Sequence, residues 1–209
     1  MSANCNHHHP HDKASTATSP RYRKILWIAL AVNLLMFAVE IGAGFRSGSV
    51  SLLADAIDFF GDAANYGVTL LVLSMGVVWR GRAALLKAAS MGAFGLFVMG
   101  RALWVLTQGG TPEAFTMGAI GLLALLANGV VAALLYAWRE GDANMRSVWL
   151  CTRNDALGNV AVMLAALGVF GTGTAWPDLA VATVMAGLAM TSGWAVLRQA
   201  TLELQAAKN

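Results

Sequence analysis

The chain has 209 residues, of which 57% are hydrophobic and 12% charged, and its formal net charge is +3. Soluble domains are about 45–50% apolar and about 25% charged, so this composition excludes an ordinary soluble domain and predicts a protein whose solvent is lipid. The two cysteines, at positions 5 and 151, are too few and too far apart for a disulfide-stabilised scaffold. We expect lipid as its surroundings and no nucleic-acid partner.

Residues 1–23 are polar and predict a disordered cytoplasmic tail. The tail contains a group of metal-binding residue types, namely Cys5, His7, His8, His9 and His11. Tracts rich in histidine indicate metal binding by composition only. We therefore expect the tail to collect metal without being essential, with an engineered tag as the alternative.

Six apolar segments follow, at about 24–45, 49–78, 84–107, 114–138, 147–170 and 178–199. A membrane-spanning helix needs about 20 apolar residues, and none of the segments has the alternation typical of a barrel strand. The first segment is expected to remain in the membrane, not to be cleaved as a signal peptide. The prediction is an all-α membrane protein: a six-helix transmembrane domain over 24–200 and a short cytoplasmic tail over 201–209.

The distribution of Lys and Arg predicts the orientation of the spans. If the six segments alternate in direction, eleven of these residues fall on one side of the membrane and only Arg46 falls on the other. Two more, Arg101 and Arg153, lie inside spans. We therefore expect both termini in the cytoplasm, and the protein in the inner membrane of a bacterium.

The second segment carries acidic residues in its middle. Asp58 and Asp62 are four residues apart, so they share one face of a helix. Charged groups inside a span are costly and usually functional, and two neighbouring carboxylates repel each other unless a proton or a cation lies between them. Asp55, one turn outside Asp58, either guides ions at the outer mouth or caps the helix.

The fifth segment repeats this spacing with Cys151 and Asp155. From the rise of an α-helix, antiparallel packing predicts Asp58 near the level of Asp155, with Asp62 nearer Cys151. Three carboxylates and a thiolate could then form a tetrahedral site, which suits Zn²⁺. For Cys151 the alternative is a small buried hydrophobic residue.

Other polar residues in the spans have two interpretations. Asn65 and Asn159 either support the ligand carboxylates or form hydrogen bonds between helices, and the second is favoured. Glu40 and Arg101 both fall near the outer ends of their spans, which predicts a structural ion pair.

The second and fifth segments together resemble the cation diffusion facilitator family. The resemblance is carried by Ser51-Leu-Leu-Ala-Asp-Ala-x-Asp-x-x-x-Asp62 and by Cys151-x-x-x-Asp155-x-x-x-Asn159. It implies six spans and a transport site at Asp58, Asp62, Cys151 and Asp155. It also implies that Zn²⁺ or a similar ion is exchanged for protons, commonly by a homodimer.

Two departures from the family pattern bear on specificity and assembly. Cys151 stands where the family usually has His or Asp, and all four histidines of the chain lie in the tail. Because thiolate ligands favour soft ions, we expect Zn²⁺ first and Cd²⁺ next, with Co²⁺ and Fe²⁺ less favoured. We also expect a short form that lacks the family's cytoplasmic C-terminal domain.

The predicted activity is secondary active transport, not enzyme catalysis. Carboxylates and a thiol at low dielectric would hold protons that a bound cation displaces, so inward protons would drive metal outward. The metal is the substrate, and no permanent cofactor is expected. The alternatives are a non-transporting membrane metal sensor or partner protein, and an intramembrane thiol enzyme with Cys151 as nucleophile and Asp155 beside it.

Overall fold

The computed structural model describes residues 20–72, 77–138 and 143–206, and within these ranges it contains helices and no strands. The elements are α1 (Pro20–Ser47), α2 (Val50–Val72), α3 (Val77–Gln108), α4 (Ala114–Leu135), the short 3-10 helix η1 (Tyr136–Trp138), α5 (Ala143–Thr172) and α6 (Trp176–Ala206). The predicted all-α class is confirmed, and six long helices are present, although α2 ends at Val72 and α3 begins at Val77, whereas the second predicted span ran to residue 78.

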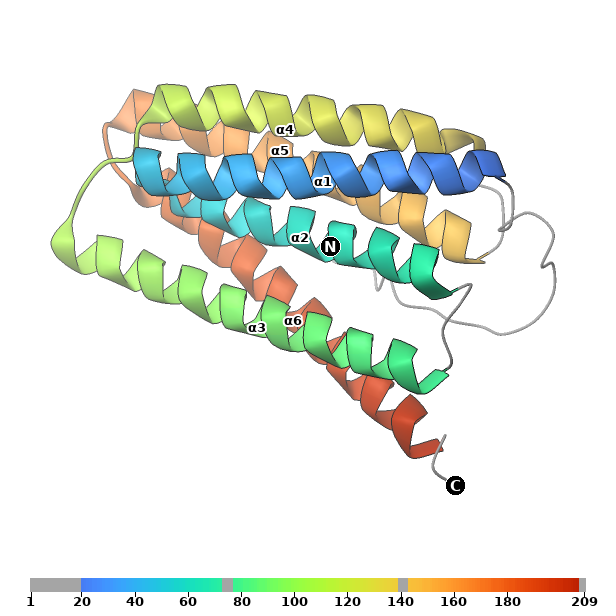
Figure 1. Cartoon of the computed structure of the whole chain (residues 1–209). Coiled ribbons are helices and arrows are strands. Elements are labelled where there is room, and N and C mark those ends of the chain that lie inside the picture. Colours follow the sequence, from blue (N-terminus) through green and yellow to red (C-terminus); the bar gives the residue numbers. More distant parts are fainter. Residues whose placement is uncertain (1–19, 73–76, 139–142, 207–209) are drawn as a thin grey trace.

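The six long helices run alternately in opposite directions along one bundle (Figure 1). α1 begins and α6 ends at the same end, here called the termini end. The opposite end, here called the loop end, holds the short connections between α1 and α2, α3 and α4, and α5 and α6. Gly48 makes the first of these connections at φ 72°, a left-handed conformation that glycine adopts without steric cost.

The surface of the bundle is apolar, as expected for a protein surrounded by lipid. Five of the described helices are long and apolar enough to cross a membrane. Large side chains face outward, for example Phe115 and Phe170, which are 82% and 83% exposed. The exception is α2, which carries three aspartates within eight residues. The chain is therefore an integral membrane protein, and its most acidic helix is the one that needs shielding from lipid.

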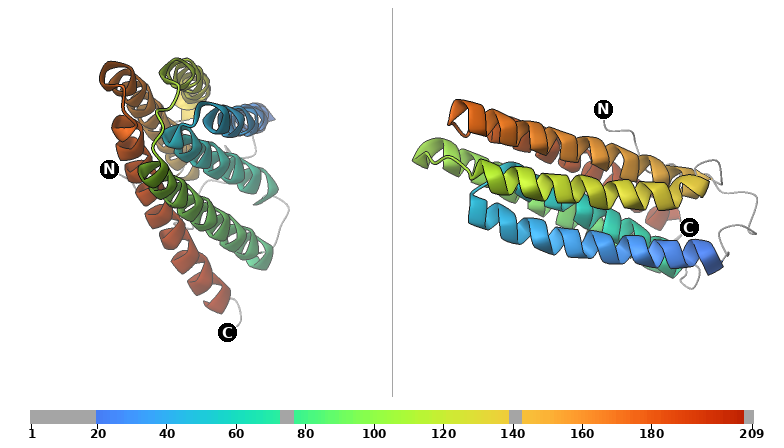
Figure 2. Two further views of the ribbon diagram at one scale, coloured as in Figure 1. Left: turned by 90° about the vertical axis from the view of Figure 1, so that its left-hand side faces the viewer. Right: turned by 90° about the horizontal axis from the view of Figure 1, so that it is seen from above.

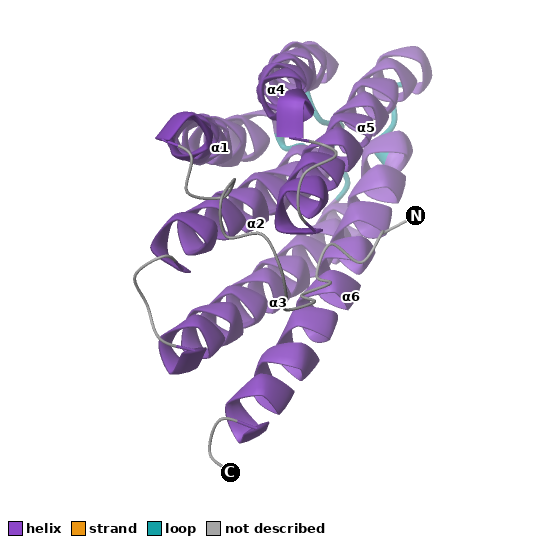
Figure 3. Ribbon diagram, turned by 90° about the vertical axis from the view of Figure 1, so that its right-hand side faces the viewer, coloured by secondary structure: helices purple, strands orange, loops and turns teal. Residues whose placement is uncertain are grey.

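The packing of the helices supplies that shielding. The most extensive contacts join α1 with α2, α4 with α5, and α3 with α6, and α2 also contacts α3, α5 and α6. Views along the bundle show α2 with α1 on one side and α5 and α6 on the other (Figures 2 and 3). Close approach of α3 and α6 requires Gly95, because a Cβ there would lie 2.6 Å from Met190 Cγ.

The N-terminus of α2 is held by an aspartate from α6. Asp178 is buried and accepts hydrogen bonds from Ser49 Oγ at 2.7 Å, from the Val50 backbone N at 2.7 Å and from the Ser51 backbone N at 3.0 Å. The free N–H groups of a helix start favour such an anionic acceptor. Asp178 therefore caps α2 across the helix interface, and the capping role considered for Asp55 is wrong.

Candidate metal-binding site

The middle of α2 meets α5 through a chain of hydrogen bonds. Tyr66 Oη donates to Asp62 Oδ2 at 3.1 Å and lies 2.7 Å from Thr152 Oγ1. Since the tyrosine proton is directed at the carboxylate, the Thr152 hydroxyl is the donor in the second bond. All three side chains are buried. This relay fixes the orientation of Asp62 and joins the two helices on the termini side of that carboxylate.

A second contact between α2 and α5 brings two carboxyl groups together. Asp155 on α5 lies close to Asp62 on α2, and Asp58 is also near it. Asp155 Oδ2 has no hydrogen-bond partner. The three acids that the sequence singled out are thus neighbours, in the long helices α2 and α5.

The register of α5 on α2 differs from the one predicted. Tyr66 opposite Thr152 and Asp62 opposite Asp155 place Asp58 near the level of Asp155's next turn, at Asn159. The predicted pairing of Asp58 with Asp155 is therefore off by about one helical turn. The predicted depths of Asp58 and Asp155 were counted from the ends of the apolar segments. The helices extend beyond those ends, so the count could not give the register between α2 and α5.

The described acidic side chains do not form a complete metal-binding site in this structure. Among the residues that the structure describes, no three His, Cys, Asp or Glu side chains converge closely enough to hold a metal ion. The side chain of Cys151 lies outside that description, and so do Cys5, His7, His8, His9 and His11 of the tail. The metal role of Asp58, Asp62, Cys151 and Asp155 therefore stays a prediction.

Asn159 is a fully buried amide with no hydrogen-bond partner for either Oδ1 or Nδ2. The expectation that it forms a bond between helices is wrong. It lies one turn from Asp155 on the same helix, near the level of Asp58. A buried amide without partners is costly, so this one is free to serve the neighbouring carboxylates or an ion. Asn65 is half-buried on the turn after Asp62, and its role stays a prediction.

The predicted ion pair between Glu40 and Arg101 is also wrong. Neither carboxylate oxygen of Glu40 accepts a hydrogen bond, and Arg101 Nε donates none. α1 packs mainly against α2 and α4, and α3 mainly against α6 and α2, and the side chains that join α1 to α3 are aromatic, Phe37 with Phe94 and Phe45 with Phe97. Glu40 instead lies near Asp55 on α2.

The residues that sequence reasoning missed are Tyr66 and Thr152. Tyr66 follows Asp62 by four residues, and Thr152 precedes Asp155 by three. Both positions share the helix face of the neighbouring aspartate. The same spacing argument that joined Asp58 with Asp62 would have found them, had it been extended to hydroxyl groups.

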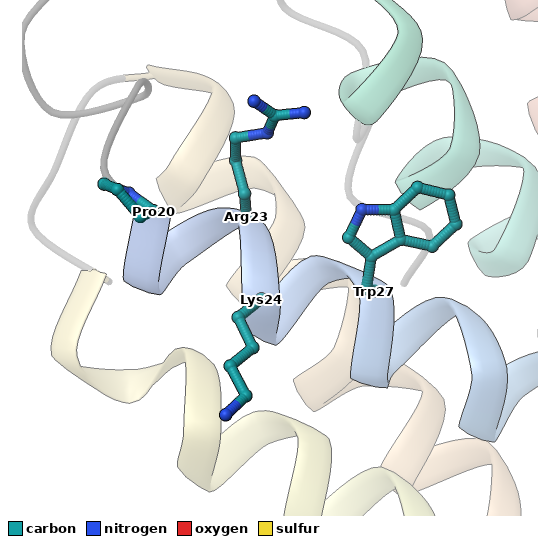
Figure 4. Close-up of a pocket in the computed structure, with 4 residues that line it drawn as sticks. All are labelled: Pro20, Arg23, Lys24 and Trp27. Carbon is teal, nitrogen blue, oxygen red and sulfur yellow. The ribbon is translucent and has the colours of Figure 1, made fainter.

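A separate pocket lies at the termini end, along the start of α1. It is lined by Pro20, Arg23, Lys24 and Trp27, and Arg23 and Lys24 project from different sides of the helix (Figure 4). None of these four described residues carries a carboxylate, thiol or imidazole. Arg and Lys beside Trp are typical of the membrane–water interface.

Comparisons with known proteins identify the bundle. Residues 26–78 and 82–205 match the cation efflux transmembrane domain. The chain belongs to the cation diffusion facilitator family. This confirms the resemblance inferred from α2 and α5, and it excludes the intramembrane thiol enzyme, because members of this family are metal transporters.

Several bacterial relatives have the same domain. The zinc transporter ZitB of Escherichia coli is 30% identical, over 95% of this chain and 67% of the relative. A cadmium, cobalt and zinc/H(+)-K(+) antiporter of Bacillus velezensis is 23% identical, over 92% of this chain and 64% of the relative. The metal cation efflux system protein CzcD of Cupriavidus metallidurans is 22% identical, over 83% of this chain and 58% of the relative. The chain thus spans about two thirds of the length of such relatives.

Proposed function

We propose that this protein exports a divalent transition-metal ion from the cytoplasm, Zn²⁺ first and Cd²⁺ next, in exchange for protons. The observation that carries the proposal is the meeting of Asp62 with Asp155 across α2 and α5, with Asp58 beside them. Carboxylates in the middle of helices within a membrane are costly and are expected to serve an ion pathway. The names of the relatives, which refer to zinc, cadmium and cobalt, support the same class of substrate.

The proposed ligands are Asp58, Asp62, Cys151 and Asp155. Their oxygens, with the thiolate, offer the four donors of a tetrahedral site, and the soft sulfur favours Zn²⁺ and Cd²⁺ over harder ions. The Tyr66 hydroxyl holds Asp62 in place, as supporting hydrogen bonds do for ligating carboxylates elsewhere. Asn159 is the next amide within the site and would support Asp58.

The direction of transport follows from the proposed orientation. The bias of Lys and Arg favours a cytoplasmic termini end, so metal would enter there and leave at the loop end. Binding of a cation to protonated carboxyl and thiol groups releases protons. Inward protons would then drive metal outward across the inner membrane of a bacterium, with a homodimer as the expected assembly.

Transport into proteoliposomes tests the proposal. Purified protein is reconstituted with a Zn²⁺-sensitive dye inside the vesicles, and uptake is followed with and without an inside-acid pH gradient. We expect uptake that the gradient accelerates and that Asp155→Asn abolishes, whereas Glu113→Gln, at an exposed acid on the loop side, leaves it unchanged. Equal uptake without the gradient would contradict antiport.

The identity of the ion is tested by substitutions at Cys151. Competition titrations with Zn²⁺ and Cd²⁺ would compare the parent with Cys151→His and Cys151→Ser. We expect both variants to lose preference for Cd²⁺, since each removes the soft ligand. An unchanged preference would remove Cys151 from the ligand set. Tight metal binding without any transport would favour the membrane sensor over the transporter.

A further inference from the structure

Two buried asparagines lie in the middle of α1 and α4. Asn33 on α1 is 0% exposed and Asn128 on α4 is 1% exposed. The Oδ1 atom of each lacks a hydrogen-bond partner. The orientation of the Asn33 amide is fixed, because its Nδ2 donates to the Ala29 carbonyl at 2.8 Å. Two acceptor oxygens are therefore left unpaired in the interior of the bundle, which lowers stability.

The level of the two asparagines follows from the hydrophobic clusters on either side of them. The cluster toward the termini end has members from α1, α2 and α4, among them Ala29, Tyr66 and Val131. The cluster toward the loop end has a buried member from each of the same helices: Met36, Phe59 and Ala124. Asn33, Asp62 and Asn128 each lie three or four residues from both cluster members of their own helix. This spacing keeps each of them on the helix face of those members, so the three side chains share one layer.

Contacts between α4 and α5 place Asp155 in the same layer. A Cβ on Gly121 of α4 would lie 3.5 Å from Val162 Cγ1 of α5. The two helices are antiparallel (Figure 1), so the seven residues from Gly121 to Asn128 correspond to the seven residues from Val162 back to Asp155. Each of α1, α2, α4 and α5 thus supplies one polar side chain. We call these four residues the oxygen layer: Asn33, Asp62, Asn128 and Asp155.

The oxygen layer is rich in acceptors and poor in donors. Carboxylates accept only, and Asp155 Oδ2 and the two amide oxygens have no partner. Two donors of this region are already used, since the Tyr66 hydroxyl donates to Asp62 and Asn33 Nδ2 donates to a backbone carbonyl. A cation would match the carboxylates, and its water would donate to the amide oxygens. The layer therefore fits a cation that keeps part of its water.

We propose that the oxygen layer is a second binding position for a divalent cation, in which every protein donor is an oxygen. Carboxylate, carbonyl and water oxygens suit harder ions such as Mn²⁺, whereas the thiolate of Cys151 suits soft ions. The two positions share Asp62 and Asp155, so an ion moves between them by exchanging the amide oxygens for Asp58 and Cys151. The inference rests on the proposed function, because it uses two carboxylates of that site.

Binding of Mn²⁺ and of Cd²⁺ to the purified full chain separates the two positions. Free Mn²⁺ is measured by its electron paramagnetic resonance signal, which broadens on binding, and Cd²⁺ binding is measured by calorimetry. We expect the parent to bind Mn²⁺, and Asn33→Leu and Asn128→Leu each to weaken that binding about three- to tenfold, since each removes one acceptor oxygen. Their Cd²⁺ affinity should stay within about twofold. Cys151→Ser should do the reverse, with a lower Cd²⁺ affinity and an unchanged Mn²⁺ affinity.

Asn128→Asp keeps an oxygen at this position and adds a negative charge, so it should bind Mn²⁺ at least as tightly as the parent. This variant decides the question if the leucine substitutions prevent folding, and a weaker Mn²⁺ affinity in it would overturn the inference. The inference is also overturned if the parent binds Cd²⁺ but no Mn²⁺, or if the leucine substitutions weaken both ions alike, and in these cases the proposed function stands. A parent that binds neither of these ions nor Zn²⁺ overturns the proposed function as well.

Discussion

Two aspartates of this bundle are equally buried but differ in their hydrogen-bond partners. Asp178 and Asp55 are each 1% exposed. Asp178 accepts three hydrogen bonds at the start of α2. Asp55, five residues into the same helix, has no hydrogen-bond partner for its Oδ2. The first carboxylate has its charge matched by donors, and the second does not.

The difference shows that burial of an acid is a poor indicator of function on its own. A carboxylate at a helix start with three donors is explained by stability. A carboxylate, or an amide such as Asn159, that is buried and lacks partners lowers stability. A membrane protein that keeps such groups on two neighbouring helices is expected to use them. Substitutions in the two regions should therefore have opposite consequences.

The largest contrast is expected between Asp62→Asn and Asp178→Asn. Asp62→Asn should lower Zn²⁺ transport in everted vesicles by more than about 100-fold, because even residues that support metal ligands contribute about 10–100-fold. Its unfolding temperature should change little, since asparagine still accepts from Tyr66. Asp178→Asn should retain transport per folded molecule. If both variants transported alike, Asp62 would belong with Asp178 as a structural acid.

For the free energy of unfolding, the larger effect is expected at Asp178, not at Asp62. Asp178→Ala should lower the free energy of unfolding by about 2–4 kcal/mol, because it removes a cap and leaves buried donors unpaired. Denaturant titration of the detergent-solubilised protein measures this loss. Asp178→Asn keeps one acceptor oxygen and should lose less. A fully stable Asp178→Ala variant would mean that water replaces the carboxylate and that the cap contributes little.

The sequence predicted the fold well because long apolar segments leave few alternatives in lipid. The six helices and their alternation follow from length, hydropathy and the glycine-containing connections such as Gly48. The sequence could not show that Asp178 of α6 caps the N-terminus of α2. That contact joins residues more than 120 positions apart, and no local pattern marks it.

The candidate site could also be predicted only in part, because the sequence shows spacing within a helix but not the contacts between helices. Spacing along one helix placed Asp58 beside Asp62, and antiparallel packing predicted Asp155 near them, although about one helical turn out of register. Partners on other helices depend on register and on which helices touch. Hence Glu40 was assigned to Arg101 on α3, although α1 packs against α2, and the Tyr66–Thr152 bond was missed.

Tyr66→Phe tests whether the hydrogen bond to Asp62 contributes to metal binding. The substitution removes only the hydroxyl that donates to Asp62, so Zn²⁺ affinity should fall about tenfold. The stability should fall by about 1 kcal/mol, the typical value of one hydrogen bond. Thr152→Val, which removes the donor behind Tyr66, should have the same direction and a smaller effect. Competition with a Zn²⁺-binding dye measures both, and unchanged affinity in Tyr66→Phe would limit the relay to joining the helices.

The smallest expected change in stability comes from removing a buried amide that has no hydrogen-bond partner. Asn159→Ala removes a buried amide without partners and raises helix propensity, so the folded state should become more stable by up to about 1 kcal/mol. Zn²⁺ affinity should nevertheless fall, since the amide supports Asp58. Asn128→Ala makes the same substitution on another helix: Asn128 is 1% exposed on α4 and its Oδ1 is likewise unpaired, and we expect a smaller loss of affinity there than in Asn159→Ala. A clear loss of stability in Asn159→Ala would show that Asn159 is structural, like Asp178, and would remove it from the group of buried polar residues kept for transport.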